Sequence, residues 1–497
     1  MTRRILLGLL ALVLLLAVVL VANTLRQGSR QLSVAPLPPL AVDEAGVTQA
    51  MAAAVRAKTV SGLLNPAGTA IEFDTLHALL KARYPLAHEK LTREVVGNHS
   101  LLFTWKGTDP KAKPVALMAH QDVVPIAPGT EQLWKKPPFA GVVEDGFVWG
   151  RGTLDDKSNV ITQLEALEML LKAGVAPRRT IYVVFGHDEE VGGGLGVVPI
   201  VALLKARGVQ LDWVLDEGLA VTEGVMPGVA QPVALIGLAE KGSVSIKLTA
   251  TTAPGHSSMP PGPGGSAIGM LSQALARLDQ APLPGGIQGA AAELFAAVAP
   301  ELPFGQRLAL SNLWLTRPLV ERLLAKGAST NAMMRTTTAM TVFNAGIKEN
   351  VLPGQAEAVV NFRILPGDSI ESVQAYVKQV IADDRIKVEV MAPAFNPSRL
   401  SSSQTDAFKL VERTVREVFP DSIVAPGLML AGSDARHFDG ISDASFRFMP
   451  IRFNSEDLSR PHGTDERIAT KQLADMVRFY HRLLQQAAGS SAEGNKP

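Results

Sequence analysis

Histidine, aspartate and glutamate residues recur in five short motifs of this sequence, and these side chains bind divalent cations through nitrogen and oxygen. Adjacent carboxylates repel each other, and a cation placed between them removes that cost. Two histidines with three carboxylates suit a site for two zinc ions that share one bridging carboxylate. The motifs are Met118–Asp122 (MAHQD), Gly150–Lys157 (GRGTLDDK), Gly186–Glu190 (GHDEE), Leu215–Gly218 (LDEG) and Arg460–Arg467 (RPHGTDER).

Taken singly, each motif has a simpler structural explanation. A lone histidine such as His120 is more often a hydrogen-bonded structural residue than a metal ligand. Asp155 and Asp156 precede a helical pattern and fit a helix N-cap. Glu189 and Glu190 fit a solvated turn. The metal-site hypothesis therefore rests on the combination of the motifs and not on any one of them.

Four of the motifs lie at the ends of short apolar segments that predict buried strands of a parallel α/β sheet. Open sheets of this kind bind ligands at the carboxyl ends of their strands, where loops converge. The fifth motif, near the C-terminus, can return to the same edge. The segment from Lys157 to Ala173 predicts a helix, because apolar residues recur on one face and Gly174 ends it. The predicted strands are 115–119, 180–185 and 213–215.

The pattern changes after Gly242. Strands and helices there follow the order β-α-β-β-α-β, which predicts a ferredoxin-like α+β domain interrupted by a long helical insertion at 282–335. A second α/β stretch resumes near Asp406 and ends with a helix at 470–486. The simplest architecture is one α/β domain, split in sequence by a smaller inserted domain. The predicted strands are 244–251, 337–343, 355–364 and 386–391, and the predicted helices are 266–279 and 369–383.

The N-terminus predicts a membrane-spanning segment. The apolar run Ile5–Ala22 lies between Arg3–Arg4 and Arg26, and at about 1.5 Å per residue it spans roughly 27 Å. An uncleaved signal anchor is favoured over a cleaved signal peptide, because Leu20 is a poor residue at position −3 of a cut after Ala22. The N-terminal arginines favour a body in the periplasm or outside the cell. A cleaved signal would make the protein secreted.

Composition excludes several classes of protein. Hydrophobic residues make up 47% and charged residues 19% of the 497 residues, which rules out a disordered chain. A net charge of +1 leaves no basic field for phosphates, so we expect no nucleic-acid partner. Cysteine is absent, which excludes disulfides, thiolate metal sites and cysteine nucleophiles. Any metal must therefore be held by His, Asp and Glu.

In this order, the five motifs resemble those of the co-catalytic di-zinc metallopeptidases, which include aminoacylases, bacterial glutamate carboxypeptidase, succinyl-diaminopimelate desuccinylase and carboxypeptidase S. The resemblance spans roughly residues 50–485, and the insertion makes it closest to the carboxypeptidase S branch. It implies an α/β fold, with a zinc-peptidase-type catalytic domain split in sequence and an inserted ferredoxin-like α+β lid domain that the insertion enlarges. The expected units are a membrane anchor (1–30), a linker (31–45), the first segment of the catalytic domain (46–241), the lid or dimerisation domain (242–394), the second segment of the catalytic domain (395–487) and a tail (488–497).

The resemblance also implies metal ligands. His120 and Asp216 would bind one zinc ion, and Glu190 and His462 would bind the other. Asp155, the first acidic residue before the lysine, would bridge the two ions. The ligand set also tolerates cobalt or manganese.

Further roles follow from the same resemblance. Glu189 would be the general base, and Asp122 would accept a hydrogen bond from the His120 imidazole and so orient it. His256, in Gly255–Ser258 (GHSS), would reach over the metal site, commonly from the partner of a homodimer formed through the lid. The residues expected to bind substrate are Asn350 and Arg363, which would hold a free carboxylate, and Ser433 and Arg436, which would line the same pocket.

These expectations define a zinc-dependent hydrolase of amide bonds in peptides or N-acyl amino acids. A deacetylase or desuccinylase of small amides is the alternative within the same class. An inactive metal-binding protein displayed on the membrane is the alternative from another class. Glu189 disfavours the inactive protein, because such a protein would be free to lose its base.

Overall fold

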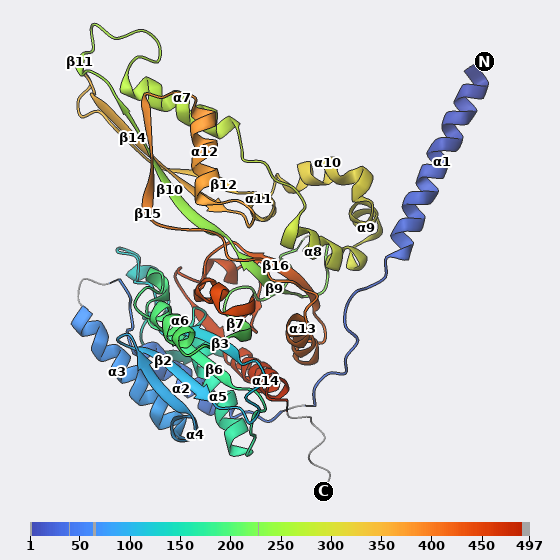
Figure 1. Cartoon of the computed structure of the whole chain (residues 1–497), viewed down its shortest axis with the longest axis vertical. Helices are drawn as coiled ribbons and strands as arrows, with labels where there is room; N and C mark the ends of the chain where they lie inside the picture. The colour runs from blue at the N-terminus through green and yellow to red at the C-terminus, as the bar shows by residue number, and fades with distance from the viewer. Residues whose placement is uncertain (1, 39, 63–65, 227, 490–497) are drawn as a thin grey trace.

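The computed structural model describes residues 2–38, 40–62, 66–226 and 228–489, so most of the expected tail lies outside the described residues. The catalytic domain lies below the inserted lid domain, and helix α1 (Thr2–Arg26) projects away from both (Figure 1). The α/β fold with an inserted α+β lid is the fold that the motifs predicted.

A ten-stranded mixed sheet forms the centre of the catalytic domain. Its middle strands β6, β3, β7 and β17 are parallel neighbours. Every residue of β3 and β6 is buried, which is the uniform apolar pattern of parallel strands covered on both faces. The order is β1 (Thr92–Val96), β2 (Ser100–Trp105), β6 (Ile181–Gly186), β3 (Val115–His120), β7 (Leu211–Asp216), β17 (Ser442–Arg447), β9 (Val233–Glu240), β8 (Val221–Thr222) and β18 (Arg452–Phe453), with β16 (Ile423–Met429) paired to β9.

Helices cover both faces of this sheet. On one face α5 (Lys157–Lys172) packs against α14 (Thr470–Ala487) and α2 (Glu44–Arg56). On the other face lie α6 (Val197–Ala206) and the short helix η4 (Asp434–Gly440). Both helices predicted beside the motifs, 157–173 and 470–486, are confirmed. Smaller elements of this domain are α3 (Pro66–Arg83), α4 (Pro85–Lys90), α13 (Asp406–Val418) and a three-stranded sheet of β19 (Arg467–Ala469), β5 (Phe147–Trp149) and β4 (Val142–Glu144).

The lid is an antiparallel four-stranded sheet in the order β12-β14-β10-β15, and two helices pack on one face. Along β14, buried residues alternate with partly exposed ones, because only one face meets the helices. The short strand β11 (Gly255–His256) lies at the tip farthest from the catalytic domain (Figure 1). The elements are β10 (Gly242–Thr251), α7 (Ala267–Gln280), β12 (Thr337–Ala345), β14 (Gln355–Ile364), α12 (Ile370–Ile381) and β15 (Ile386–Phe395), which confirms the predicted order.

The insertion at 282–335 is helical, as predicted, but the expectation that it enlarges the lid is wrong. Its first helix packs against β16 of the catalytic sheet. The physical reason is a shared core, in which Leu294 and Val298 join Val233, Ile423 and Ala425. The insertion consists of α8 (Gly289–Val298), α9 (Phe304–Ser311), α10 (Leu313–Leu324) and α11 (Ala328–Met334).

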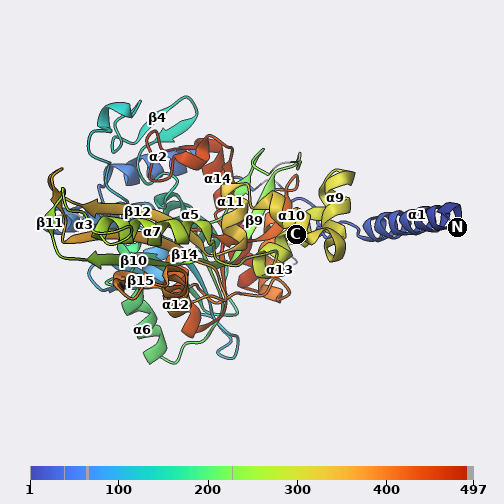
Figure 2. The same ribbon diagram turned by 90° about the horizontal axis from the view of Figure 1, so that it is seen from above.

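The described residues between α1 and α2, 27–38 and 40–43, form no helix or strand, but the segment contacts the catalytic domain. Gln31 exchanges two hydrogen bonds with the backbone of Val424, at 3.0 and 2.6 Å. The amide of Leu37 donates to the carbonyl of Glu417 at 3.0 Å. Seen from above, α1 extends outward on the side where α9 lies (Figure 2). Among the described residues, α1 is the one helix long and apolar enough to cross a membrane.

Candidate active site

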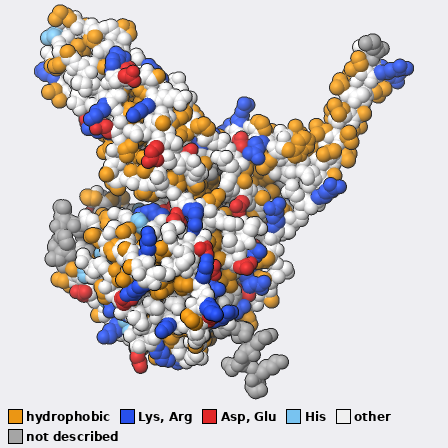
Figure 3. Space-filling view, in the orientation of Figure 1, with side chains coloured by type: hydrophobic (Ala, Val, Ile, Leu, Met, Phe, Trp, Pro, Cys, Tyr) orange, Lys and Arg blue, Asp and Glu red, His pale blue; other side chains and the backbone are white. Residues whose placement is uncertain are grey.

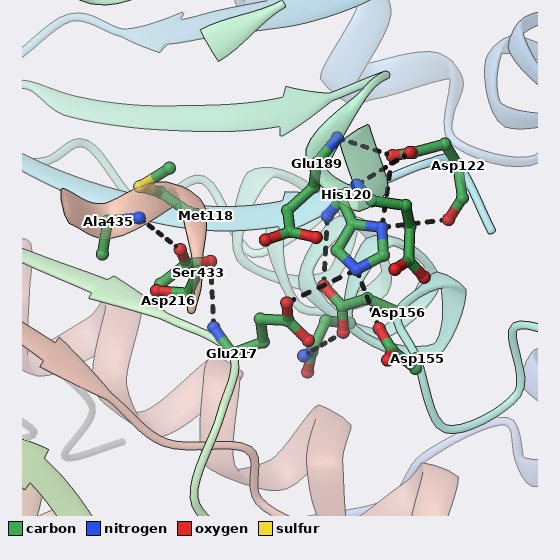
Figure 4. Close-up of polar contacts among 12 residues, drawn as sticks. Met118, His120, Asp122, Asp155, Asp156, Glu189, Asp216, Glu217, Ser433 and Ala435 are labelled. Atoms are coloured by element: carbon green, nitrogen blue, oxygen red, sulfur yellow. Dashed lines mark hydrogen bonds and ion pairs between the residues drawn. The ribbon is translucent and has the colours of Figure 1, made fainter. Parts of the chain in front are cut away.

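His120 stands at the carboxyl end of β3, buried among carboxylates (Figure 4). Its Nδ1 donates to the backbone carbonyl of Asp122 at 2.9 Å and lies 3.3 Å from the Asp122 carboxylate. Its Nε2 lies 2.8 Å from Asp155 Oδ1 and 3.4 Å from Glu217 Oε1. Because a carbonyl can only accept, the proton sits on Nδ1 and Nε2 is left for a ligand.

The buried carboxylate of Asp122 also binds the loop that carries Glu189 and Glu190, a contact that the motif does not predict. Its two oxygens accept hydrogen bonds from the backbone amides of Glu189 and Glu190, both at 3.1 Å. Asp122 therefore joins the end of β3 to the loop after β6, and it positions both His120 and the glutamate pair.

The adjacent residues Asp155 and Asp156 point to different partners, and the peptide bond between them is cis. Asp155 lies between the two histidines, 2.8 Å from His120 Nε2 and 3.1 Å from His462 Nε2. Asp156 instead accepts from the backbone amide of His120 at 3.1 Å. The buried carboxylate of Glu466 fixes this loop by accepting from the Asp155 amide at 3.2 Å.

His462 brings the C-terminal motif to the same edge of the sheet. Its Nε2 lies 3.1 Å from both Asp155 Oδ2 and Glu190 Oε2. Its backbone has a φ of 59°, a left-handed conformation that is uncommon outside glycine. Arg151 and Glu466 form a buried ion pair at 2.6 Å beneath this loop, which holds the motif against the loop that carries Asp155.

The structure brings Glu217, and not Asp216, to His120. Both oxygens of Asp216 accept backbone hydrogen bonds, from the amides of Glu217 at 2.9 Å and Ala435 at 2.8 Å. The carboxylate of Glu217 instead forms one donor group with His120 and Asp156. The two neighbouring carboxylates thus have different contacts, since backbone amides hold Asp216 and Glu217 faces His120.

Close packing of carboxylates shifts the acidities of the site. Burial acts to lower the pKa of His120, but the charge of Glu217 and hydrogen bonds to neighbouring carboxylates raise it well above its usual value. Burial and the negative charge of Asp155 raise the pKa of Glu217 to about 8. Hydrogen bonds to two carboxylates raise the pKa of His462 to about 10. The site thus concentrates negative charge that a cation would neutralise.

Glu189 faces this cluster without joining either donor group. Its side chain points into the space beside His120 (Figure 4). Burial raises the pKa of its carboxyl group well above the usual value; His120 opposes this shift, and nearby carboxylates add to it. A general base must hold the proton that it takes until it delivers that proton to the leaving group. A carboxyl group with a raised pKa can hold a proton near neutral pH.

His256 and Asn350 lie far from the site within one chain, at the lid tip (Figure 1). His256 lies on β11, and the carbonyl of Asn350 accepts from the amide of Ser257 at 3.1 Å, so both belong to the lid tip. Arg363 is exposed near the other end of the lid, where β14 pairs with Ser243 at the start of β10.

Ser433 and Arg436 lie at the junction of the two domains. The buried hydroxyl of Ser433 donates to Glu240 Oε2 at 2.7 Å. Arg436 donates to the Ser433 carbonyl at 2.9 Å and lies 3.6 Å from Glu240 Oε1. Both side chains thus contact Glu240, at the end of β9, which leads into the lid.

Comparison with known families agrees with this arrangement. The model of the peptidase family M20/M25/M40 matches residues 116–486, most of the chain. The chain belongs to this family. Members of the M20/M25/M40 family are metal-dependent, and the present chain is a hydrolase of peptide or amide bonds. The predicted relationship to the co-catalytic metallopeptidases is thereby confirmed.

Relatives within the M20/M25/M40 family place the chain near carboxypeptidase S. It is 39% identical to a probable carboxypeptidase S-like 2 of Dictyostelium discoideum over 94% of this chain and 91% of that protein. It is 42% identical to the N-fatty-acyl-amino acid synthase/hydrolase PM20D1 of Homo sapiens over 80% and 78%. It is 30% identical to carboxypeptidase S of Saccharomyces cerevisiae over 83% and 78%.

Solved structures of M20 enzymes share the fold. The metallo-carboxypeptidase Sso-CP2 of Sulfolobus solfataricus superposes with a TM-score of 0.63 at 17% identity, over 90% of this chain and all of that one. Human carnosine dipeptidase 1 gives 0.61 at 16% identity, over 91% and 100%.

The donor set of this M20 chain fits divalent metal ions. Two groups of donors have ligand atoms within 4.8 Å of one another, and both include His120. Oε1 of Glu190 is buried and has no hydrogen-bond partner among the described residues, which is unusual for a carboxylate oxygen unless a cation takes the place. The groups are His120, Asp155 and Glu190, and His120, Asp156 and Glu217.

Proposed function

We propose that the chain is a two-metal hydrolase of amide bonds in small peptides or N-acyl amino acids, with Glu189 as its base. The observation that carries the proposal is Asp155, whose carboxylate lies between His120 and His462. A carboxylate shared by two imidazoles is where a bridging ligand belongs. Glu189, beside this pair, remains available for proton transfer.

Two zinc ions, or cobalt or manganese, would be held by five side chains. His120 and Glu217 would bind the first ion, with Glu217 replacing the expected Asp216. Glu190 and His462 would bind the second, and Asp155 would bridge. When bound, such ions supply Lewis-acid chemistry: a lower pKa for the attacking water and polarisation of the scissile carbonyl.

Protein side chains would carry out the proton transfer and hold the reacting groups in position. Glu189 takes a proton from the attacking water and delivers it to the leaving amine, which converts a poor leaving group into a neutral one. Asp122 keeps Glu189 in place through its backbone amide, 3.1 Å from the carboxylate. The same carboxylate orients His120, so one buried group fixes both the base and a ligand.

The names of the relatives support the proposed substrate class. A carboxypeptidase substrate and an N-fatty-acyl amino acid both carry a free carboxylate beside the scissile amide. Arg363 is exposed on the lid, and a guanidinium fork suits a carboxylate. The purified chain should therefore hydrolyse dipeptides or N-acyl amino acids and should fail on their C-terminally amidated analogues. Activity confined to small acetyl or succinyl amides would favour the deacetylase alternative, and no hydrolysis at all would favour the inactive binding protein.

We predict different effects for Glu217→Gln and Asp216→Asn. Glu217→Gln should lose one of two metal ions, and added metal should partly restore its activity. Asp216→Asn should keep both ions and lower the free energy of unfolding by about 1–3 kcal/mol, because it weakens hydrogen bonds to a buried charge. Metal analysis with thermal or urea unfolding distinguishes the two. Loss of metal in Asp216→Asn alone would restore the assignment expected from the motif.

We predict that His256 acts on the site of a partner chain in a homodimer. His256→Ala and Glu189→Gln should each be strongly impaired. When the two variants are mixed after partial unfolding, activity should return, because a mixed dimer combines an intact Glu189 in one chain with His256 of the partner subunit. If His256 acted within its own chain, mixing would restore nothing. The measurement is hydrolysis of one substrate by each variant and by the mixture, with mixing confirmed by tags of different size.

We predict that α1 stays attached and anchors the body outside the cytoplasm. The apolar length of α1 and its exposure support an anchor. The full chain should remain with membranes after carbonate extraction, and its body should be cleaved by protease added to intact spheroplasts. A soluble mature chain beginning near Asn23 would show a cleaved signal instead.

A further inference from the structure

The helical insertion exposes large apolar side chains beside α1. On α10, Trp314 is 63% exposed and Leu319 is 61% exposed. Leu315 and Leu323, one turn before and one turn after Leu319, are exposed as well and complete an apolar stripe. Phe304 adds to it from α9. In Figure 3, hydrophobic side chains gather where α1 meets these helices. We call Phe304, Trp314, Leu315, Leu319 and Leu323 the α9–α10 apolar face.

Core packing does not account for these residues. The opposite side of α10 supplies the core contacts, with Val320 buried and Leu313 and Leu324 packed in the same cluster. Helix α10 is therefore apolar on both sides, whereas a surface helix of a soluble domain presents polar residues outward. Its outer stripe needs an apolar environment that the described residues of the chain do not provide.

Hydrogen bonds fix the helical insertion to the end of α1. Asn312 donates to the carbonyl of Leu20 at 3.2 Å and to Thr24 Oγ1 at 3.1 Å. Asn23 donates to the carbonyl of Ser311 at 2.7 Å. Arg307 donates to the carbonyl of Thr24 at 3.2 Å. The insertion is thus held at the point where the apolar span ends, and Thr24 is fully buried between them.

Basic residues surround the same surface. Between Phe304 and Gly327 the chain has four basic residues and one acidic residue, Glu321. Glu321 is already engaged, because it accepts from the Ile287 amide at 2.8 Å and pairs with one of the arginines at 3.6 Å. An excess of positive charge beside an apolar stripe suits anionic lipid headgroups. The basic residues are Arg307, Arg317, Arg322 and Lys326, and α1 adds Arg26 at its end.

We propose that the α9–α10 apolar face lies in the interfacial region of the same bilayer that α1 enters. This inference rests on the proposed anchor. The lipid surface is the occupant that the contacts favour, because the face is continuous with the membrane-spanning helix and carries a tryptophan, which prefers the headgroup level. The insertion then holds the catalytic domain against the membrane surface, in place of a body that swings freely on a single helix.

Tryptophan fluorescence provides a direct test, because Trp314 is the one exposed tryptophan of five. Trp105, Trp134, Trp149 and Trp213 are all buried. The full chain is reconstituted into vesicles of phosphatidylglycerol and phosphatidylcholine, with or without bromine on the upper acyl chains. We expect a blue-shifted Trp314 emission that brominated lipid quenches, and both effects should vanish in Trp314→Phe.

A tryptophan on a distant face of the catalytic domain tests whether lipid quenching needs docking or only proximity to a vesicle. Ile71 is 67% exposed on α3, on the side of the catalytic domain remote from α1. In an Ile71→Trp/Trp314→Phe chain, iodide in the water should quench the new tryptophan and brominated lipid should not. Leu319→Asn with Leu323→Asn changes exposed side chains only, and it should reduce the lipid quenching of Trp314 while hydrolysis of a soluble substrate stays unchanged.

Three outcomes would overturn the proposal. Trp314 could stay open to iodide and closed to brominated lipid. Trp314 could be closed both to iodide and to brominated lipid, which would make this face a contact between copies of the chain. The asparagine pair could leave lipid quenching unchanged. Carbonate extraction of the same vesicles reports on the anchor separately, so an anchored chain with an undocked Trp314 refutes only the docking.

Discussion

Glu189→Gln should lower kcat by about 10²- to 10⁴-fold, because glutamine keeps the shape of the side chain and cannot take a proton. The effect is expected in kcat rather than in KM, since the base acts mainly in the transition state. Both metal ions should remain bound, because Glu189 belongs to neither donor group. Steady-state kinetics and metal analysis on the same preparation measure the two expectations together.

Glu190→Gln is the matched control, since it makes the same chemical change at the neighbouring residue. Oε2 of Glu190 lies 3.1 Å from His462 Nε2, so this variant should lose one metal ion, and excess metal should partly restore turnover. Loss of metal in Glu189→Gln with retention in Glu190→Gln would exchange the two roles. Unchanged turnover in both would refute the roles proposed for Glu189 and Glu190.

Much of the fold follows from local patterns. The segments that became β3, β6 and β7 are short, continuous and apolar, and parallel strands buried on both faces show this pattern. Along lid strands β10 and β14, buried and partly exposed residues alternate. The order of strands and helices in the lid can therefore be predicted without knowing which strands pair. The ligand motifs could be placed because polar residues directly after buried strands share one edge of the sheet.

Other features depend on contacts between distant segments. Asp216 and Glu217 are equally acidic neighbours, and the amide of Ala435, more than two hundred positions away, occupies Asp216. The different contacts of the two carboxylates are therefore invisible in the LDEG motif. The insertion reads as helical, but its attachment to β16 instead of the lid depends on a core formed with Val233 and Ile423. Asp122 likewise contacts the glutamate pair through the backbone amides of Glu189 and Glu190, which every residue type except proline has, so the motif does not show these hydrogen bonds.

Asp155→Asn should abolish activity and remove both metal ions, which is the largest effect expected for any single substitution. The Asp155 carboxylate lies 2.8 Å from His120 and 3.1 Å from His462, so it is the acidic group that the two histidines share. An amide has the same shape and lacks the charge that two cations require between them. Its loss therefore weakens both sites at once, whereas Glu190→Gln and Glu217→Gln each weaken one.

Metal stoichiometry then separates the proposed site from simpler explanations. The parent should bind two ions, Glu190→Gln and Glu217→Gln one each, and Asp155→Asn none. Excess metal should not restore Asp155→Asn. Asp145→Asn is a suitable control, because this exposed aspartate occupies a turn with a φ of 53° that asparagine tolerates well. It should keep both ions and full activity. Retention of one ion by Asp155→Asn would show that the ions do not share this carboxylate, and full activity after exhaustive chelation of the parent would refute a metal-dependent reaction.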